Sequence, residues 1–310
     1  MNKIEKFVII CGYRCNNNCV FCINSGKRQI DDKPTAQILR EMLDARKRGK
    51  VYIEFIGGEI TIRPDVFVLI KQAKEMGFNS VNMATNGRML SYPDFAKRLV
   101  ASGIDEIIFS IHGHEPLLHD SLTRVTGSFN ELVQGLKNVK KLGLKKIASN
   151  TTIVKQNYMH LPDIGKFLLN NGITNSEFIF ADPTYGGVYD DFLPLMPRIS
   201  EAAPFIRKCL SFAKKNKAIR HWHVRYVPLC YFRGYLNNIS EIDEVNNFHT
   251  EHLAPDFRNQ DVENSRKNIS REKPSKCRGC KLFSLCEGIW KEYLLKYGSG
   301  ELKSVKSGAH

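Results

Sequence analysis

The chain has 310 residues, 42% of them hydrophobic and 25% charged, which are the proportions of an ordinary soluble globular protein. This length suits one large α/β domain with an appendage, or two modest domains, and the composition excludes collagen-like and disordered chains. The 46 basic residues outnumber the 32 acidic ones, giving a net charge of +14. That balance indicates attraction to polyanions such as nucleic acid, although a solvated basic face explains the same lysines.

The amino-terminal residues contain no signal peptide, and the apolar run 7–10 is far too short to span a bilayer. We therefore expect a cytoplasmic protein with no membrane partner. Nine cysteines in such a chain favour reduced thiolates that serve metal binding or catalysis, because the cytosol does not keep structural disulfides.

Residues 7–183 alternate short β-rich runs with runs of helical period, a pattern typical of βα units with parallel strands. Ser128 is the expected N-cap of the fourth of these helices, with Glu131 three residues later. Six such units fit an α/β fold, a partial (β/α)6 barrel of the TIM type, whose functional groups gather at the C-terminal ends of the strands. The expected strands are 7–13, 51–56, 80–85, 106–111, 146–154 and 176–181, and the expected helices are 36–48, 65–76, 93–102, 128–142 and 160–171.

After Pro183 the alternation stops. We expect a helix over 197–216, a strand over 222–227, a polar and unpatterned stretch over 236–273, and a short helix near 288–297. The chain is therefore divided into a barrel (1–183), a connecting helix and strand (184–229), and a cysteine-containing region (230–310).

Cys15, Cys19 and Cys22 follow the first expected strand directly, in a polar loop. Three thiolates at these spacings can hold three irons of a 4Fe–4S cluster and leave the fourth iron without a protein ligand. The alternative is a zinc site or scattered buried cysteines. Structural zinc usually takes four ligands, and the nearest fourth, Cys11, has a place in the expected strand that points to the core.

The CxxxCxxC spacing, with the aromatic Phe21 before the last cysteine, resembles the defining motif of the radical S-adenosylmethionine (SAM) superfamily. The resemblance implies that SAM binds the open iron through its amino and carboxylate groups. It also implies reductive cleavage of SAM to a 5′-deoxyadenosyl radical that abstracts hydrogen from a substrate, with an external electron donor such as flavodoxin or ferredoxin. No residue is assigned a catalytic role beyond these cofactor contacts.

Further motifs of the same family follow in barrel order. Gly57, Gly58 and Glu59 end the second strand and match its GGE motif, which implies that they receive the SAM amino group. Thr85-Asn86-Gly87 after the third strand is similar to the family's TNG. Ser110, at the end of the fourth strand, is placed to bond the methionine moiety or the ribose.

Two later positions carry open alternatives. Arg124 lies in what resembles the loop before a barrel helix, where it clamps the SAM carboxylate or is simply a surface arginine. Asn150 and Thr152 share one face of the fifth strand, which places both toward the barrel interior, where they contact the ribose. The alternative is the ordinary alternation of polar and apolar residues along a strand.

A second group of cysteines comprises Cys277, Cys280 and Cys286, with Cys230 as a distant fourth ligand. This part resembles the SPASM and Twitch extensions of radical SAM enzymes, which implies one auxiliary 4Fe–4S cluster of the Twitch kind, because Trp290 stands where SPASM has a further cysteine. A zinc knuckle of four cysteines is the alternative. Cys209 is interpreted as a buried apolar residue.

Resemblance to SPASM/Twitch maturases favours a ribosomally made peptide as substrate, presented by a separate carrier protein or docked directly. A small metabolite or a nucleotide is the alternative substrate, and the basic balance keeps RNA open. From another class, the chain is a non-catalytic iron–sulfur or zinc protein that uses the barrel as a scaffold.

Overall fold

Nine strands of residues 3–306, the part of the chain that the computed structural model describes, form one sheet. The order is β7-β6-β5-β4-β3-β2-β1-β8-β9, so the first six strands lie side by side in chain order. Neighbouring strands pair in parallel except β8 with β9. The strands are β1 (Ile4–Ile10), β2 (Tyr52–Ile56), β3 (Ser80–Thr85), β4 (Glu106–Ser110), β5 (Lys146–Ile153), β6 (Asn175–Phe180), β7 (Trp222–Arg225), β8 (Phe248–Leu253) and β9 (Arg258–Asn259).

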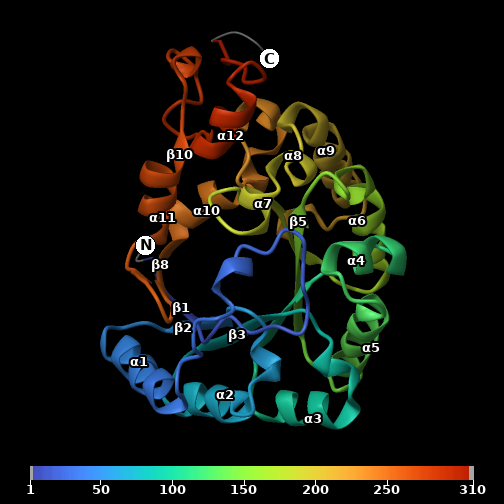
Figure 1. The fold of residues 1–310 in the computed structure, drawn as a ribbon, viewed down its shortest axis with the longest axis vertical. Helices are drawn as coiled ribbons and strands as arrows, with labels where there is room; N and C mark the ends of the chain where they lie inside the picture. Colours follow the sequence, from blue (N-terminus) through green and yellow to red (C-terminus); the bar gives the residue numbers. More distant parts are fainter. Residues whose placement is uncertain (1–2, 307–310) are drawn as a thin grey trace.

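The long helices that follow these strands form an arc around the sheet in Figure 1. The six expected βα units are confirmed, and the sheet is an open partial barrel with β7 and β9 at its edges. The first strand begins and ends earlier than the sequence pattern predicts. The helices of the arc are α1 (Thr35–Lys47), α2 (Val66–Glu75), α3 (Pro93–Ala101), α5 (Ser128–Lys141), α6 (Leu161–Asn170) and α9 (Ile199–Lys215).

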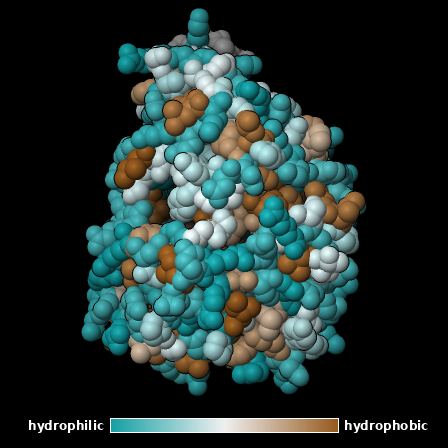
Figure 2. Space-filling model, in the orientation of Figure 1, coloured by the Kyte–Doolittle hydropathy of each residue, from teal (hydrophilic) through white to brown (hydrophobic). Residues whose placement is uncertain are grey.

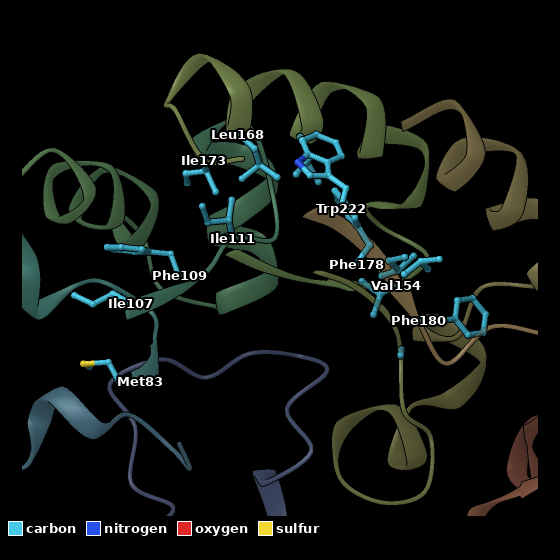
Figure 3. Packing of buried hydrophobic residues seen from close by; sticks show 14 of the residues in the cluster. Met83, Ile107, Phe109, Ile111, Val154, Leu168, Ile173, Phe178, Phe180 and Trp222 are labelled. Carbon is cyan, nitrogen blue, oxygen red and sulfur yellow. The ribbon is translucent and has the colours of Figure 1, made fainter. Parts of the chain in front are cut away.

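The two faces of the sheet differ in polarity. Alternate side chains such as Met83, Phe109 and Phe178 are buried between the sheet and the helices, where they form the main core (Figure 3). The other face is concave and carries polar side chains, among them Glu54 and Glu106. A polar inner wall surrounded by an apolar shell gives the fold a place for a polar ligand.

The segment between β4 and α5 differs from the sequence prediction. It forms a helix, α4 (Pro116–Thr123), instead of a loop, with Pro116 at its first turn. The expected Ser128 N-cap is also wrong, because Gly127 occupies that position. Asp120 of α4 accepts hydrogen bonds from Gly127 N, Phe129 N and Ser128 Oγ at 2.7–2.8 Å, so a carboxylate from the preceding helix caps α5.

The stretch 236–273, predicted to be unpatterned, contains regular structure. It forms α10 (Ser240–Asn247), β8, β9 and α11 (Val262–Ser265), and β8 extends the sheet beyond β1. Glu251 in β8 is buried and pairs with Arg48 and Arg258 at 2.5 and 2.9 Å. A periodicity rule expects an apolar residue at a buried strand position, and here the buried residue is an ion-paired glutamate. The sequence pattern therefore did not predict this strand.

Strands from both regions after residue 183, 184–229 and 230–310, join the sheet. The domain boundaries at 183 and 229 stay predictions. Residues 1–2 and 307–310 lie outside the described residues. No helix in residues 3–306 combines the length and apolar character needed to cross a membrane. On the face seen in Figure 2, hydrophobic residues are scattered among hydrophilic ones. The remaining elements are α7 (Gly187–Asp190), α8 (Phe192–Leu195), the antiparallel pair β10 (Arg271–Glu272) and β11 (Ile289–Trp290), and α12 (Lys291–Tyr297).

Candidate functional site

The first cysteine loop leaves the carboxyl end of β1 and carries three free, half-buried thiols, Cys15, Cys19 and Cys22. Its backbone is hydrogen-bonded to two other segments of the chain. Asn18 N and Val20 N donate to carbonyls of residues 123 and 122 at the end of α4, both at 2.9 Å. On the other side, the Cys22 carbonyl accepts from the backbone N–H of residue 187 at 2.9 Å. The loop is therefore held in one conformation where the strands end.

Asn86 of the Thr85-Asn86-Gly87 segment supports the same loop from β3. Its Nδ2 donates to Asn16 Oδ1 at 2.7 Å and lies 3.9 Å from Cys15 Sγ. Asn17 N also donates to Cys15 Sγ, at 3.3 Å. Burial raises the pKa of Cys15 to about 11, and the hydrogen bond from Asn17 N opposes this by favouring the thiolate, the form of cysteine that binds metal.

Two arginines that the sequence analysis missed also hold the loop. Arg88 donates to the Asn16 carbonyl and to Asn17 Oδ1, and it pairs with Glu131. Arg28 Nη2 donates to the Asn17 carbonyl at 2.8 Å. The position of Arg88, directly after the Asn86-Gly87 turn, is the signal that could have identified it.

Gly57 and Gly58 are required where β2 meets the loop. A Cβ on Gly57 would lie 2.4 Å from the Gly12 carbonyl oxygen, and one on Gly58 would lie 2.1 Å from that of Arg14. The φ of Gly57 is 138°, which disfavours any other residue. The glycines thus permit close packing of the chain on itself, a reason that the sequence did not reveal.

Glu59 is buried and its carboxylate already accepts several hydrogen bonds. Thr61 N and Oγ1 donate to Oε1 at 3.0 and 2.6 Å, Thr85 Oγ1 donates to Oε1 at 2.7 Å, and Asn86 N donates to Oε2 at 2.7 Å. Burial raises the pKa of Glu59, against the opposing effect of these hydrogen bonds. The carboxylate therefore ties the end of β2 to the end of β3, beside the first cysteine loop.

Phe21 lies against a pair of histidines behind the loop. Its ring meets that of His112 edge-on, with the centroids 4.6 Å apart. His112 Nδ1 accepts from Thr152 N at 3.2 Å, and His119 Nδ1 accepts from His112 N at 3.3 Å. Burial lowers the pKa of His112 well below its usual value and that of His119 to about 4, so both rings are neutral packing elements.

The predicted SAM contacts Ser110 and Asn150 are register partners on the inner face of the sheet. Asn150 is in turn opposite Glu177 of β6, which is opposite His223 of β7. Asn150, Glu177 and His223 border a cavity of about 190 Å³. Asn150 Oδ1 is buried and has no hydrogen-bond partner among the described residues, so it is free to accept from a ligand.

The two remaining predicted contacts lie at different depths. Thr152 is two residues beyond Asn150 on the same inner face and is half-buried. Arg124 is exposed and follows α4 in the left-handed conformation, with φ of 55°. It is adjacent to the residue-123 carbonyl that holds Asn18, so it lies at the edge of the first cysteine loop.

The second cysteine group converges in space although its members come from separate segments. Cys230 lies in a 3-10 turn, Leu229–Tyr231, and Cys277 in another, Ser275–Cys277. With Cys280 and Cys286 they line one cavity of about 20 Å³, whose other walls include Pro228, Leu282, Phe283 and Leu302. Backbone N–H groups of residues 305 and 288 donate to the sulfurs of Cys280 and Cys286, both at 3.3 Å.

Cys11 and Cys209 take structural places, as the sequence analysis expected, and Trp290 is also part of the packing. Cys11 and Cys209 are 2% and 1% exposed and belong to the hydrophobic core. Burial raises the pKa of Cys11 to about 12, so its thiol is inert at neutral pH. Trp290 is 2% exposed and packs edge-on against Tyr226, at 4.7 Å between centroids.

A chain of ion pairs joins the inner face to the second cysteine group. Glu177 accepts from Arg225 Nε at 2.8 Å, and Arg225 also pairs with Glu244. Arg266 pairs with Glu244 at 2.8 Å and with Glu287, the neighbour of Cys286, at 2.9 Å. These mostly buried pairs fix the second group relative to the barrel.

Comparison with known proteins gives concordant results. A sequence profile of the Radical SAM superfamily matches residues 9–168. The probable GTP 3′,8-cyclase of Sulfurisphaera tokodaii is 28% identical over 185 residues, 58% of this chain and 57% of that protein. The mycofactocin maturase MftC of Mycobacterium tuberculosis is 31% identical over 164 residues, 52% of this chain and 41% of MftC. The chain thus spans about half the length of these curated relatives.

Among solved structures, the fold is similar to that of SuiB from Streptococcus suis, crystallised with its precursor peptide SuiA. The TM-score is 0.69 at 17% identity, and the match covers 98% of this chain and 74% of the SuiB chain. The similarity extends beyond residues 9–168, into the region of the second cysteine group.

Proposed function

Because the chain belongs to the radical SAM superfamily, we propose that it is an enzyme that binds a 4Fe–4S cluster through Cys15, Cys19 and Cys22 and SAM at the open iron. The observation that carries this proposal is a loop of three free thiols, held by backbone hydrogen bonds where the parallel strands end. When bound, the cluster and SAM supply the one-electron chemistry of the family, the reductive cleavage of SAM to a 5′-deoxyadenosyl radical.

The chain's own residues bind and orient SAM in this proposal. Asn150 Oδ1, which is buried and has no partner among the described residues, accepts a hydrogen bond from the ligand, and Ser110 and Thr152 extend the same wall. Phe21, fixed by His112, offers an apolar surface next to Cys22. These groups set the orientation of the ligand and exclude water, which the cofactor chemistry itself cannot do.

The other end of SAM belongs near the first cysteine loop. Gly57, Gly58 and Glu59 are adjacent to the loop and are proposed to receive the amino group. Arg124 is exposed at the edge of the loop, and the forked donors of a guanidinium suit the carboxylate. Since the Glu59 carboxylate already accepts several hydrogen bonds, its contribution is chiefly to position the backbone around the ligand.

We further propose that Cys230, Cys277, Cys280 and Cys286 hold an auxiliary 4Fe–4S cluster with complete cysteine ligation. All four line one cavity, and two of their sulfurs accept backbone N–H bonds. Apolar walls and hydrogen bonds to sulfur are features by which proteins tune such clusters. A Twitch-like extension of this kind would accept an electron from the substrate or anchor it.

A ribosomally made peptide is the proposed substrate. Support comes from the similarity of the fold to SuiB, which was crystallised with a precursor peptide, and from the maturase MftC among the relatives. A separate carrier protein would present the peptide, and a flavodoxin or ferredoxin would supply the electron. The GTP 3′,8-cyclase relative makes a nucleotide the second candidate.

The test is anaerobic reconstitution with iron and sulfide, reduction with dithionite, and measurement of 5′-deoxyadenosine formed from SAM. The proposal expects this product with the wild-type chain and none with Cys22→Ala. Absence of the product from the iron-replete wild type would contradict it. Adding a panel of synthetic peptides or GTP to the same assay then compares the two substrate classes, because a true substrate accelerates product formation.

A further inference from the structure

Three side chains outside both cysteine groups meet at the rim of the barrel. His114 lies between β4 and α4, His160 ends the 3-10 turn Tyr158–His160 after β5, and Asp163 is in the first turn of α6. One ring nitrogen of each histidine and one carboxylate oxygen of Asp163 all lie within 4.8 Å of one another. Loops that follow two neighbouring strands have thus brought together two imidazoles and a carboxylate.

The hydrogen bonding of this cluster, as the structure describes it, is incomplete. His114 Nδ1 is buried and has no hydrogen-bond partner among the described residues, which is an unfavourable condition for a polar group. The two imidazole rings are stacked, with centroids 5.5 Å apart and planes 29° apart. Ring stacking does not satisfy the buried His114 Nδ1, so packing alone does not account for the arrangement.

The carboxylate of Asp163 is paired with Lys166, at 2.8 Å, on the same helix. The two side chains are 44% and 56% exposed, and exposed ion pairs at this spacing contribute little to stability. A stronger ligand can therefore displace the Lys166 ammonium without a large cost, and the ammonium competes with any cation that binds there.

We propose that His114, His160 and Asp163 form a binding site for a divalent transition-metal ion of the zinc class. Two imidazoles and one carboxylate are a ligand set that zinc accepts, with water completing the coordination. The ion would join the segment after β4 to the start of α6. His112, two residues before His114, packs against Phe21. The bound ion would therefore also restrict the motion of the residues that pack behind the first cysteine loop.

The test uses the full-length protein with its cysteine sites reconstituted with iron, so that they do not compete for zinc. Equilibrium dialysis against Zn²⁺ and metal analysis are compared for the wild type and for His160→Ala. The wild type is expected to bind one zinc ion per chain at this site, and the variant is expected to bind that ion at least about tenfold more weakly. His221→Ala, which removes an exposed histidine elsewhere, is the matched control and should bind like the wild type.

Two further variants separate binding from misfolding. Zinc should raise the Tm of the wild type, because it binds the folded state. Asp163→Asn preserves the shape of the side chain and should lose both the bound zinc and this rise in Tm. Lys166→Gln removes the competing ammonium and should bind zinc several-fold more tightly. Equal zinc binding by wild type, His160→Ala and Asp163→Asn would overturn the proposal, and the iron content, measured in parallel, tests the cysteine sites independently.

Discussion

The two cysteine groups are built in different ways. Cys15, Cys19 and Cys22 come from one short loop after β1 and number three. The second group takes Cys230 from one segment and three cysteines from another, lies among Leu282, Phe283 and Leu302, and numbers four. This difference in composition predicts different roles for the two cysteine groups. A three-thiol site, which leaves one iron of a cluster without a protein ligand, suits ligand binding, whereas a four-thiol site with apolar walls suits electron storage or anchoring.

The largest expected effect is that of removing one thiol from the first group. Cys19→Ala should abolish measurable 5′-deoxyadenosine formation and lower the iron content from roughly eight to about four per chain, because a cluster with two thiolates is not retained. Cys11→Ala is the matched control, since Cys11 belongs to the core, and it should keep its iron. Wild-type SAM cleavage by Cys19→Ala would remove the distinction between the two groups.

Removing one thiol from the second group should have a more selective effect. Cys277→Ala is expected to lose about four irons and substrate turnover while still cleaving SAM, because the first cysteine loop is untouched. Cys209→Ala, another core cysteine, should behave like the wild type. If the second group instead holds zinc whether or not the protein is reconstituted, the proposed auxiliary cluster is wrong.

Loss of a loop support should weaken the first site without emptying it. Arg88→Ala removes the donor to the Asn16 carbonyl and Asn17 Oδ1. By analogy with outer-shell residues of metal sites, we expect SAM cleavage to fall about 10–100-fold. Arg220→Ala, at an exposed position, provides the baseline. Unchanged cleavage by Arg88→Ala would show that the loop does not depend on this arginine.

A smaller effect is expected on the inner wall. Asn150→Ala should raise the KM for SAM about fivefold, the equivalent of one hydrogen bond of about 1 kcal/mol, with little change in iron content. Asn246→Ala, on α10, controls for the loss of an amide. A lower kcat with the same KM would mean that Asn150 acts on the substrate instead of on SAM.

The smallest effect concerns the helix that anchors the first cysteine loop. Burial would raise the pKa of Asp120, but hydrogen bonds from Phe129 N, Ser128 Oγ and Gly127 N outweigh it, and the pKa is lowered. A carboxyl whose pKa is lower in the folded state stabilises the protein above its unfolded pKa, and this contribution is lost as the pH falls through the folded pKa. Asp120→Asn should thus cost about 1 kcal/mol in chemical denaturation at pH 7.

The pH dependence provides its control. The difference between Asp120→Asn and the wild type should shrink as both are measured at increasingly acid pH, because the wild-type carboxyl then becomes protonated as well. A difference that stays constant with pH would assign the effect to altered packing and not to the charge of the cap.

Local patterns in the sequence predicted one part of the molecule well. The six βα units were predictable because each buried strand and amphipathic helix has its own period, and the spacing of Cys15, Cys19 and Cys22 is contained within one loop. The glycines 57 and 58 were identified as important, yet their physical reason is contact with the Gly12 and Arg14 carbonyls, which only the fold brings close.

Features that depend on distant partners were not predictable. Strand β8 was missed because Glu251 is buried by pairing with Arg48 and Arg258, which a hydrophobicity pattern cannot register. The cap of α5 was assigned to Ser128, whereas Asp120 of the preceding helix supplies the acceptors. Cys230 could be named as a distant fourth ligand, but its place in the same cavity as Cys277 depends on the packing of separate segments.

The open iron of the first cluster is tested most directly by electron paramagnetic resonance of the reduced Cys277→Ala protein, in which the first cluster is the one expected to remain. The account predicts that adding SAM changes the signal of this cluster, because the ligand binds to the iron itself. A signal that is identical with and without saturating SAM would contradict the central claim.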